Sequence, residues 1–148
     1  MTSDSRFKKR SRSERLENVR SERATAVPEE PKLVFNFKDF DAAQSVSQSF
    51  EAWQKAGKLA DLMVKLQHLS QCSLTEAIAE KQVSVYGAFP AGSGFRPPKH
   101  IAPDVQWAVI KGMKGQKGRV AGYVIGNVFY VVFLDQNHRF WVTEKKGT

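Results

Sequence analysis

The sequence contains a single cysteine, Cys72, among its 148 residues. One cysteine excludes an intramolecular disulfide and a cysteine-based zinc site, and with no neighbouring base we expect a structural thiol. Uninterrupted apolar runs of about 18 residues are also missing, and the polar N-terminus does not resemble a signal peptide. These absences predict a cytoplasmic protein without a membrane span.

Acidic residues are scarce in the second half of the chain. Residues 81–148 hold ten of the 23 Lys and Arg residues but only three of the 15 Asp and Glu residues, and the net charge is +8. Such an excess favours a polyanionic partner, either nucleic acid or the ribosome, through phosphate neutralisation. A basic, solvated surface without such a partner is the alternative.

Several motifs of well-known enzymes are absent as well. No Walker A loop, serine elbow, dinucleotide fingerprint or H-E-x-x-H motif occurs. The three histidines, His68, His100 and His138, do not show metal-ligand spacing, and His68 is expected to be solvated. We therefore expect neither a metal nor a cofactor.

The composition changes near residue 31. Residues 1–31 are rich in Ser, Arg and Glu and end in the sequence VPEEP. This composition predicts a charged, basic tail that is disordered or partly helical. Residues 32–148 are predicted to form a single domain.

Hydrophobic periodicity predicts one strand and then helices. Residues 33–37 are predicted to be a strand, and Phe50 and Trp53 mark a first helix. Gly57 either separates this helix from the next or kinks a longer one. The second helix has one apolar face, formed by Leu59, Leu62, Met63, Leu66 and Leu69. Ser73 and Glu76 match a capping box that opens a short third helix.

The second half predicts strands. In residues 83–89 Val83, Val85 and Phe89 alternate with other residues in an extended stretch, and residues 105–110 are predicted to be a strand. The Gly126-Asn127 turn joins two further strands, 120–125 and 128–134. A last short strand or an extended tail is expected at 138–142. The order predicts an α+β domain, in which the N-terminal strand and the helical pair pack on an antiparallel meander. The helices would cover one sheet face and leave the other free to bind.

Two segments carry polar groups suited to RNA chemistry. Cleavage by an attacking 2′-hydroxyl needs a base, an acid and positive charge on the phosphorane oxygens. Arg119, at the start of a strand, can hold a phosphate bidentately, and His138 is the best acid or base by its ordinary pKa. The preceding Gly-rich loop contributes Lys111, Lys114 and Lys117, although it can equally be a plain hairpin connection.

Further residues extend this basic constellation. Arg139 follows His138, and Trp141 offers a face on which a base can stack, although a core position is an equal alternative. The long loop 87–104 contains Arg96, Lys99 and His100, and we interpret it as a lid or rim.

The segments KGRV, GY, FYVVFL and HRFW within residues 117–141, together with the element order, resemble the RelE/HigB/YoeB-like superfamily of toxin–antitoxin toxins. The similarity in order spans residues 32–142, and the residue-level match spans 105–141. It implies a small RelE-like α+β fold, cleavage of messenger RNA at the ribosome and an antitoxin partner. It further implies that Arg119 stabilises the transition state and that His138, or else Tyr123 or Tyr130, moves a proton. The tail and the loop 87–104 depart from the compact members.

Two other functions stay open. A non-catalytic nucleic-acid-binding module can have the same shape, and so can a protein that inhibits a host complex. ParE-like members of the superfamily act on gyrase, so the fold alone does not decide.

Overall fold

Five strands and three helices are found in the residues that the structure describes, and all belong to the second of two units, residues 31–148. The computed structural model describes residues 29–112 and 118–142. The predicted tail 1–31 therefore lies almost wholly outside the described residues, and so do Lys114 and Lys117.

The strands form one sheet in the order β1-β5-β4-β3-β2. They are β1 (Val34–Asn36), β2 (Val83–Gly87), β3 (Gln106–Ile110), β4 (Arg119–Ile125) and β5 (Val128–Asp135). The last four make the predicted antiparallel meander. However, β1 does not pack on this meander; it joins it by pairing parallel to β5. The α+β class is confirmed, and the sheet is mixed instead of wholly antiparallel.

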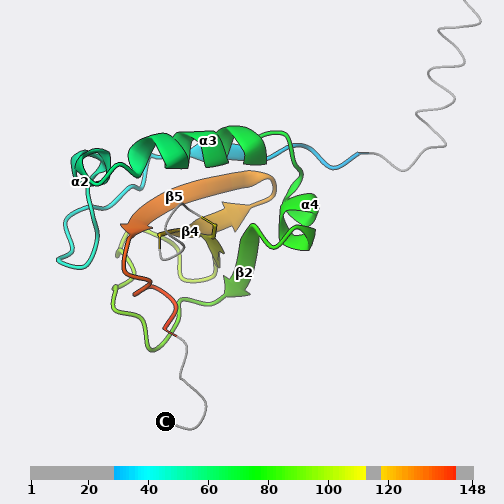
Figure 1. Ribbon diagram of the computed structural model, residues 1–148. Coiled ribbons are helices and arrows are strands. Elements are labelled where there is room, and N and C mark those ends of the chain that lie inside the picture. The colour runs from blue at the N-terminus through cyan, green and yellow to red at the C-terminus, as the bar shows by residue number, and fades with distance from the viewer. Residues whose placement is uncertain (1–28, 113–117, 143–148) are drawn as a thin grey trace, which may run out of the picture. The chain divides into compact units, whose positions relative to one another are not determined.

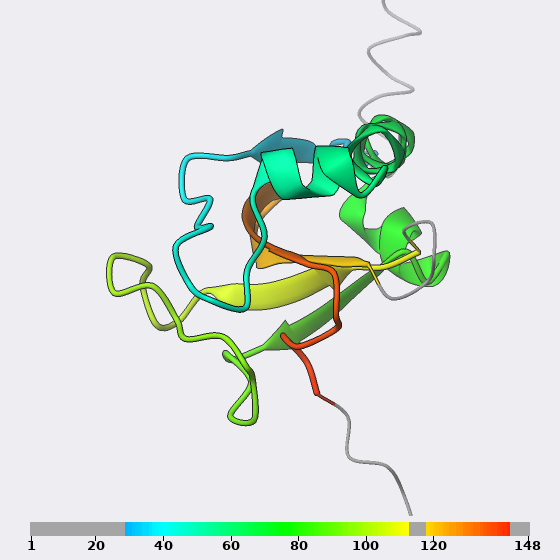
Figure 2. The same cartoon turned by 60° about the vertical axis from the view of Figure 1, so that its left-hand side comes forward.

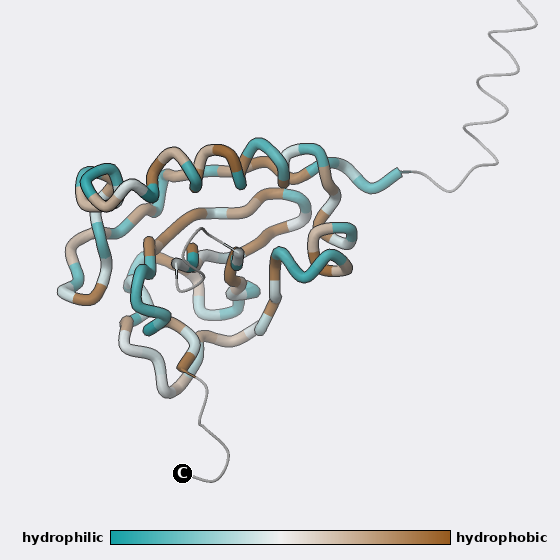
Figure 3. The backbone as a smooth tube through the Cα atoms, in the orientation of Figure 1, coloured by the Kyte–Doolittle hydropathy of each residue, from teal (hydrophilic) through white to brown (hydrophobic). Residues whose placement is uncertain are grey.

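The β4–β5 hairpin forms as its sequence predicts. Gly126 adopts a φ of +61°, which the primed turn requires and which glycine tolerates without strain. Figure 3 shows largely hydrophobic residues along both strands and a hydrophilic turn between them. With a partner strand on each side, β5 is central, and most of its residues are buried.

The helices are α2 (Phe50–Lys55), α3 (Leu59–Leu69) and α4 (Leu74–Ala79). Gly57, with a φ of +74°, ends the first of them and so separates α2 from α3. The predicted capping box is present, because Ser73 and Glu76 exchange side-chain and backbone hydrogen bonds. Along α3 the predicted leucines face the core, but Met63 is 56% exposed and lies off that face. Figure 1 shows α3 running along β5.

Each face of the sheet has its own hydrophobic core. The helix-side core includes Trp53 and Phe129, and the opposite core is centred on Trp107. Side chains from outside the sheet complete the second core: Phe95 and Ile101 from the loop after β2, and Phe140 from the segment after β5. Figure 2 shows this loop on the side of the strands away from α2 and α3. The expectation of a free binding face is thus wrong, because apolar residues of the loop cover it.

The segment after β5 begins with a turn and forms no strand at 138–142, where a short strand or an extended tail was predicted. The buried carboxylate of Asp135 accepts hydrogen bonds from the backbone N–H groups of Arg139 (2.8 Å) and Phe140 (2.7 Å). Because these two N–H groups donate to Asp135, they are not available for the hydrogen bonds of a β-ladder. The same turn places Phe140 in the core. Within the described residues, no helix combines the length and apolar character needed to cross a membrane.

Candidate functional site

A buried carboxylate lies at the centre of the most developed polar cluster. Asp39 is 7% exposed and accepts hydrogen bonds from three side chains. The hydroxyl of Tyr123 donates to Oδ2, Nζ of Lys38 lies 3.2 Å from the same oxygen, and Nε2 of His100 lies 3.1 Å from Oδ1. The cluster joins the turn after β1, strand β4 and the loop after β2.

Backbone contacts fix the turn that carries Asp39. The β4–β5 register shifts between Ala121 and Gly122, and this leaves Val132 as a bulged residue on β5. The carbonyl of Val132 accepts the N–H of Asp41 at 2.7 Å, two residues beyond Asp39. The bulge therefore anchors the turn against the sheet and brings Asp39 over β4.

The surroundings keep Asp39 ionised at neutral pH. Burial raises the pKa of its carboxyl, but hydrogen bonds from Tyr123, Lys38 and His100, together with the charge of Lys38, lower the pKa below its ordinary value. Burial and the bond to Asp39 raise the pKa of the Tyr123 phenol. Tyr123 thus stays protonated and acts as a fixed donor to the carboxylate.

His100 is the exposed member of the cluster. Its side chain is 63% exposed, whereas its partner carboxylate is buried. Because an ionised Asp39 only accepts, Nε2 of His100 must carry the proton, and the neutral ring then has its lone pair on Nδ1. A carboxylate that orients an imidazole in this way prepares it to take up a proton.

Lys38 places a positive charge beside this pair. Its side chain is 62% exposed, and Nζ lies 5.5 Å from the centroid of the Tyr130 ring. Tyr130 in turn stacks on Tyr123 with centroids 4.5 Å apart. The cluster therefore combines an anchored imidazole, a solvent-facing ammonium and an aromatic platform.

The loop that carries His100 is tied down at Arg96. The side-chain amide of Gln44 bonds both the N–H of Arg96 (2.8 Å) and its carbonyl (2.7 Å). Close to His100, the loop encloses a hollow of about 420 Å³ between prolines and the rings of Phe89 and Trp107. Lys99 is the charged residue that lines it.

The predicted catalytic residues lie at a different place, the end of the hairpin at which Asp135 closes β5. Arg119 pairs with Asp135 in the sheet register, is half-buried, and donates from a guanidinium nitrogen to the carbonyl of Gly118 at 3.1 Å. His138 is exposed in the turn that Asp135 holds, with a φ of +58°. The structure thus brings Arg119 and the His138 turn to one end of the hairpin.

The predicted RNA-contacting residues are scattered. Arg139 is exposed, and its carbonyl accepts the N–H of Gly94 at 2.8 Å. Trp141 is half-buried and stacks on Tyr86, with centroids 4.0 Å apart, so one of its faces is already occupied. Lys111 follows β3, where its N–H donates to the carbonyl of Gln82.

Sequence reasoning did not find the Asp39–His100 pair. The two residues are 61 positions apart, and only the fold makes them neighbours. A usable signal was the polar pair Lys38-Asp39 directly after a strand, together with a histidine in the proline-rich loop. Comparisons of the chain with protein-family models, curated proteins and solved structures gave no match.

Proposed function

We propose that the chain is a metal-independent endoribonuclease of the toxin type, in which His100 is the general base and Asp39 orients it. The observation that carries this proposal is the hydrogen bond between an exposed imidazole and a buried, ionised carboxylate. Proton transfer of this kind contributes typically about 10²–10⁴-fold to a rate.

The reaction follows from the positions of these groups. Nδ1 of His100 takes the proton of an RNA 2′-hydroxyl, whose oxygen attacks the adjacent phosphorus. The bond from phosphorus to the 5′-oxygen breaks, and the leaving oxygen takes a proton from solvent water. The products are a 2′,3′-cyclic phosphate and a 5′-hydroxyl. Lys38 supplies positive charge for the phosphorane oxygens, which accumulate charge in the transition state.

RNA as the substrate is supported by the basic second half of the chain. Lys99, next to His100, and Arg139, whose carbonyl accepts the N–H of Gly94 in the same loop, are candidates to contact a phosphate backbone. The further proposals, a RelE-like fold, messenger RNA at the ribosome as target and a neutralising antitoxin, rest on the resemblance of residues 105–141 and on the element order.

The test is induced expression of the chain, with growth and the cleavage of translated messenger RNA as readouts. We expect arrest and cleavage from the wild type, and a loss of about 100-fold or more in cleavage rate for His100→Ala. Lys38→Ala should also reduce cleavage. Lys55→Ala, an exposed lysine on α2 paired with Glu51, is the matched control and should leave cleavage unchanged.

Two outcomes would contradict the proposal, the first in the location of the catalytic site and the second in the enzymatic activity itself. If His100→Ala cleaves normally while Arg119→Ala and His138→Ala do not, the reaction occurs at the hairpin end. If the wild type neither arrests growth nor cleaves, but binds RNA with a steep salt dependence, the chain is a non-catalytic binding module.

A further inference from the structure

Three side chains of metal-ligating type converge where α3 meets α4. One donor atom each from His68, Cys72 and Glu80 lies within 4.8 Å of the other two. His68 is in the last turn of α3, Cys72 follows the end of that helix, and Glu80 is the C-cap of α4. Nε2 of His68 is already 3.3 Å from Oε1 of Glu80. The spacing of four residues from His68 to Cys72 brings both to one side of the helix end.

The backbone holds these residues in place without a ligand. The N–H of Cys72 donates to the carbonyl of Leu69, and its own carbonyl accepts the N–H of Leu33 just before β1. The capping box at Ser73 then fixes the start of α4 one residue after Cys72. At the end of α4, the N–H of Glu80 donates a hydrogen bond to the carbonyl of Glu76 at 2.9 Å. The ligand positions are therefore preorganised by secondary structure, which is what a specific metal site requires.

The charges around Cys72 favour a cation. The carboxylates of Glu80 and Glu76 are both close enough to its thiol to act on it electrostatically. The positive charge of Lys32 is partly offset, because its Nζ lies 3.6 Å from Glu76. A divalent cation between the thiol and Glu80 would compensate the remaining negative charge, and a thiol that coordinates a metal is deprotonated.

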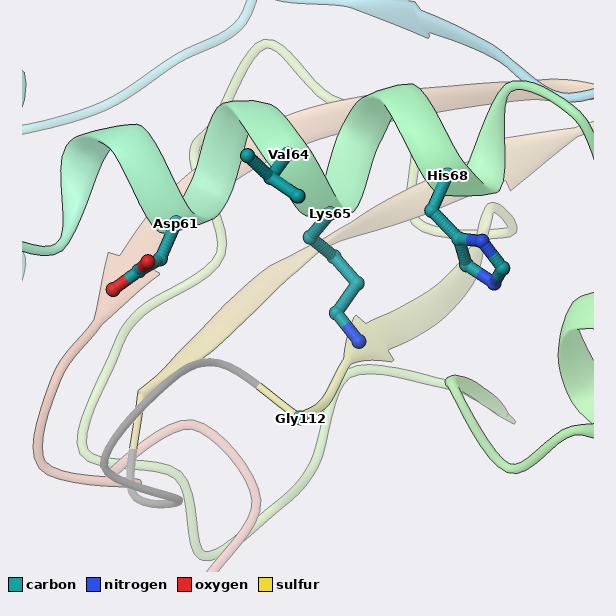
Figure 4. A pocket seen from close by; sticks show the side chains of 5 residues that line it. All are labelled: Asp61, Val64, Lys65, His68 and Gly112. Carbon is teal, nitrogen blue, oxygen red and sulfur yellow. The ribbon is translucent and has the colours of Figure 1, made fainter.

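We propose that His68, Cys72 and Glu80 bind one Zn²⁺ ion. A thiolate, an imidazole and a carboxylate together suit zinc, whereas Mg²⁺ and Ca²⁺ prefer oxygen ligands alone. Three protein ligands leave a fourth position for water, and it can be reached because the side chains of His68 and Glu80 are about half exposed. Figure 4 shows His68 on the same side of α3 as Asp61 and Lys65, where it borders an open hollow of about 460 Å³.

This site is separate from the cluster around His100. Cys72 belongs to the core on the helix side of the sheet, and Tyr123 belongs to the core on the other face. The ion would clamp the end of α3 to the end of α4, and it takes no part in the proposed cleavage. The sequence predicts no metal site, because the chain has one cysteine and its histidines lack ligand spacing, whereas the fold brings Cys72 together with His68 and Glu80.

The experiment is titration of the metal-free full chain with Co²⁺ and Zn²⁺. We expect one equivalent to bind, with a thiolate-to-cobalt charge-transfer band in the near ultraviolet. Zinc should displace the cobalt. Zinc added to the metal-free chain should release about one proton per ion at neutral pH, measured by calorimetry in two buffers, because the thiol binds as a thiolate. The melting temperature of the chain should rise when zinc binds.

Variants decide whether the three named residues are the ligands. Cys72→Ser should abolish the charge-transfer band, and His68→Gln and Glu80→Gln should each weaken binding at least roughly tenfold, since even outer-sphere changes cost about that much. His138→Gln, an exposed histidine outside the cluster, is the matched control.

The absence of stoichiometric binding by the wild type would overturn the proposal. Unchanged affinity in His68→Gln would do so as well. That variant alters an exposed side chain, so it decides the question even if Cys72→Ser lowers the stability of the fold.

Discussion

The hydroxyl of Tyr123 donates a hydrogen bond to the buried carboxylate of Asp39, although 84 residues separate the two in the chain. Tyr123 is on β4, in the middle of the sheet, whereas Asp39 is in a turn beyond the edge strand β1. The sheet thereby positions the carboxylate directly, in addition to the backbone hydrogen bond that anchors its turn. His100, on a long loop, takes its orientation from that carboxylate.

Replacing Tyr123 by Phe removes this donor and keeps the ring. We expect the free energy of unfolding to fall by about 1–3 kcal/mol, because a charged, buried acceptor loses one partner. Urea denaturation measures the change. Tyr86→Phe, in which the ring still stacks on Trp141, is the control and should change stability by less than about 0.5 kcal/mol. If both variants lost the same free energy of unfolding, the hydrogen bond between Tyr123 and Asp39 would not stabilise the fold.

The ionisation of Asp39 predicts how stability depends on pH. Its pKa in the folded chain lies below the ordinary value of 3.8. A carboxyl of this kind stabilises the fold at pH values above its unfolded pKa and loses that contribution as the pH falls through the folded pKa. The stability difference between the wild type and Asp39→Asn should thus be full at neutral pH and shrink below pH 3.8. A difference that stays constant down to pH 3 would contradict this explanation.

Gly122 is predicted to tolerate no side chain. A Cβ atom at this position would lie 1.9 Å from the carbonyl oxygen of Tyr130 on the neighbouring strand, beside the bulge of β5. Gly122→Ala must therefore push β4 and β5 apart, and we expect a loss of more than about 3 kcal/mol or failure to fold. Gly92→Ala, where nothing lies within 4 Å, should leave the melting temperature almost unchanged. A stable Gly122→Ala variant would show that the strands can separate at little cost.

Asp135 is predicted to fix the turn that carries His138. Asp135→Ala leaves the N–H groups of Arg139 and Phe140 without their acceptor, and we expect a loss on the order of 3 kcal/mol. Asn137→Ala, in the same turn but exposed, should cost little. Differential scanning calorimetry gives both values. A small effect at Asp135 would mean that water replaces the carboxylate.

The elements that depend on nearby residues could be predicted from the sequence. The Gly126-Asn127 turn, the leucine spacing of α3 and the capping box at Ser73 all act within a few residues, and each is present. At 138–142, where a short strand or an extended tail was predicted, no strand forms, because the side chain of Asp135 accepts N–H groups that periodicity alone would assign to a ladder.

The long-range arrangement could not be predicted in the same way. No local sequence pattern predicts that β1 pairs parallel with β5, or that the loop after β2 folds over the second face of the sheet. The Asp39–His100 pair depends on both arrangements. Its residues therefore had no visible relation in the sequence, whereas Arg119 and His138 were selected by their residue types and by the resemblance of the segment that contains them.

The parallel pairing of Val34 with Val128 also bears on how the chain is made. Strand β1 pairs only with β5, which is synthesised much later. During synthesis β1 therefore has no partner strand until almost the entire domain has emerged from the ribosome. Domains with such distant contacts fold slowly, because a long loop must close before the contact forms. Until then Phe35 and the apolar side of α3 are exposed surfaces on which a nascent chain can aggregate and to which a chaperone can bind.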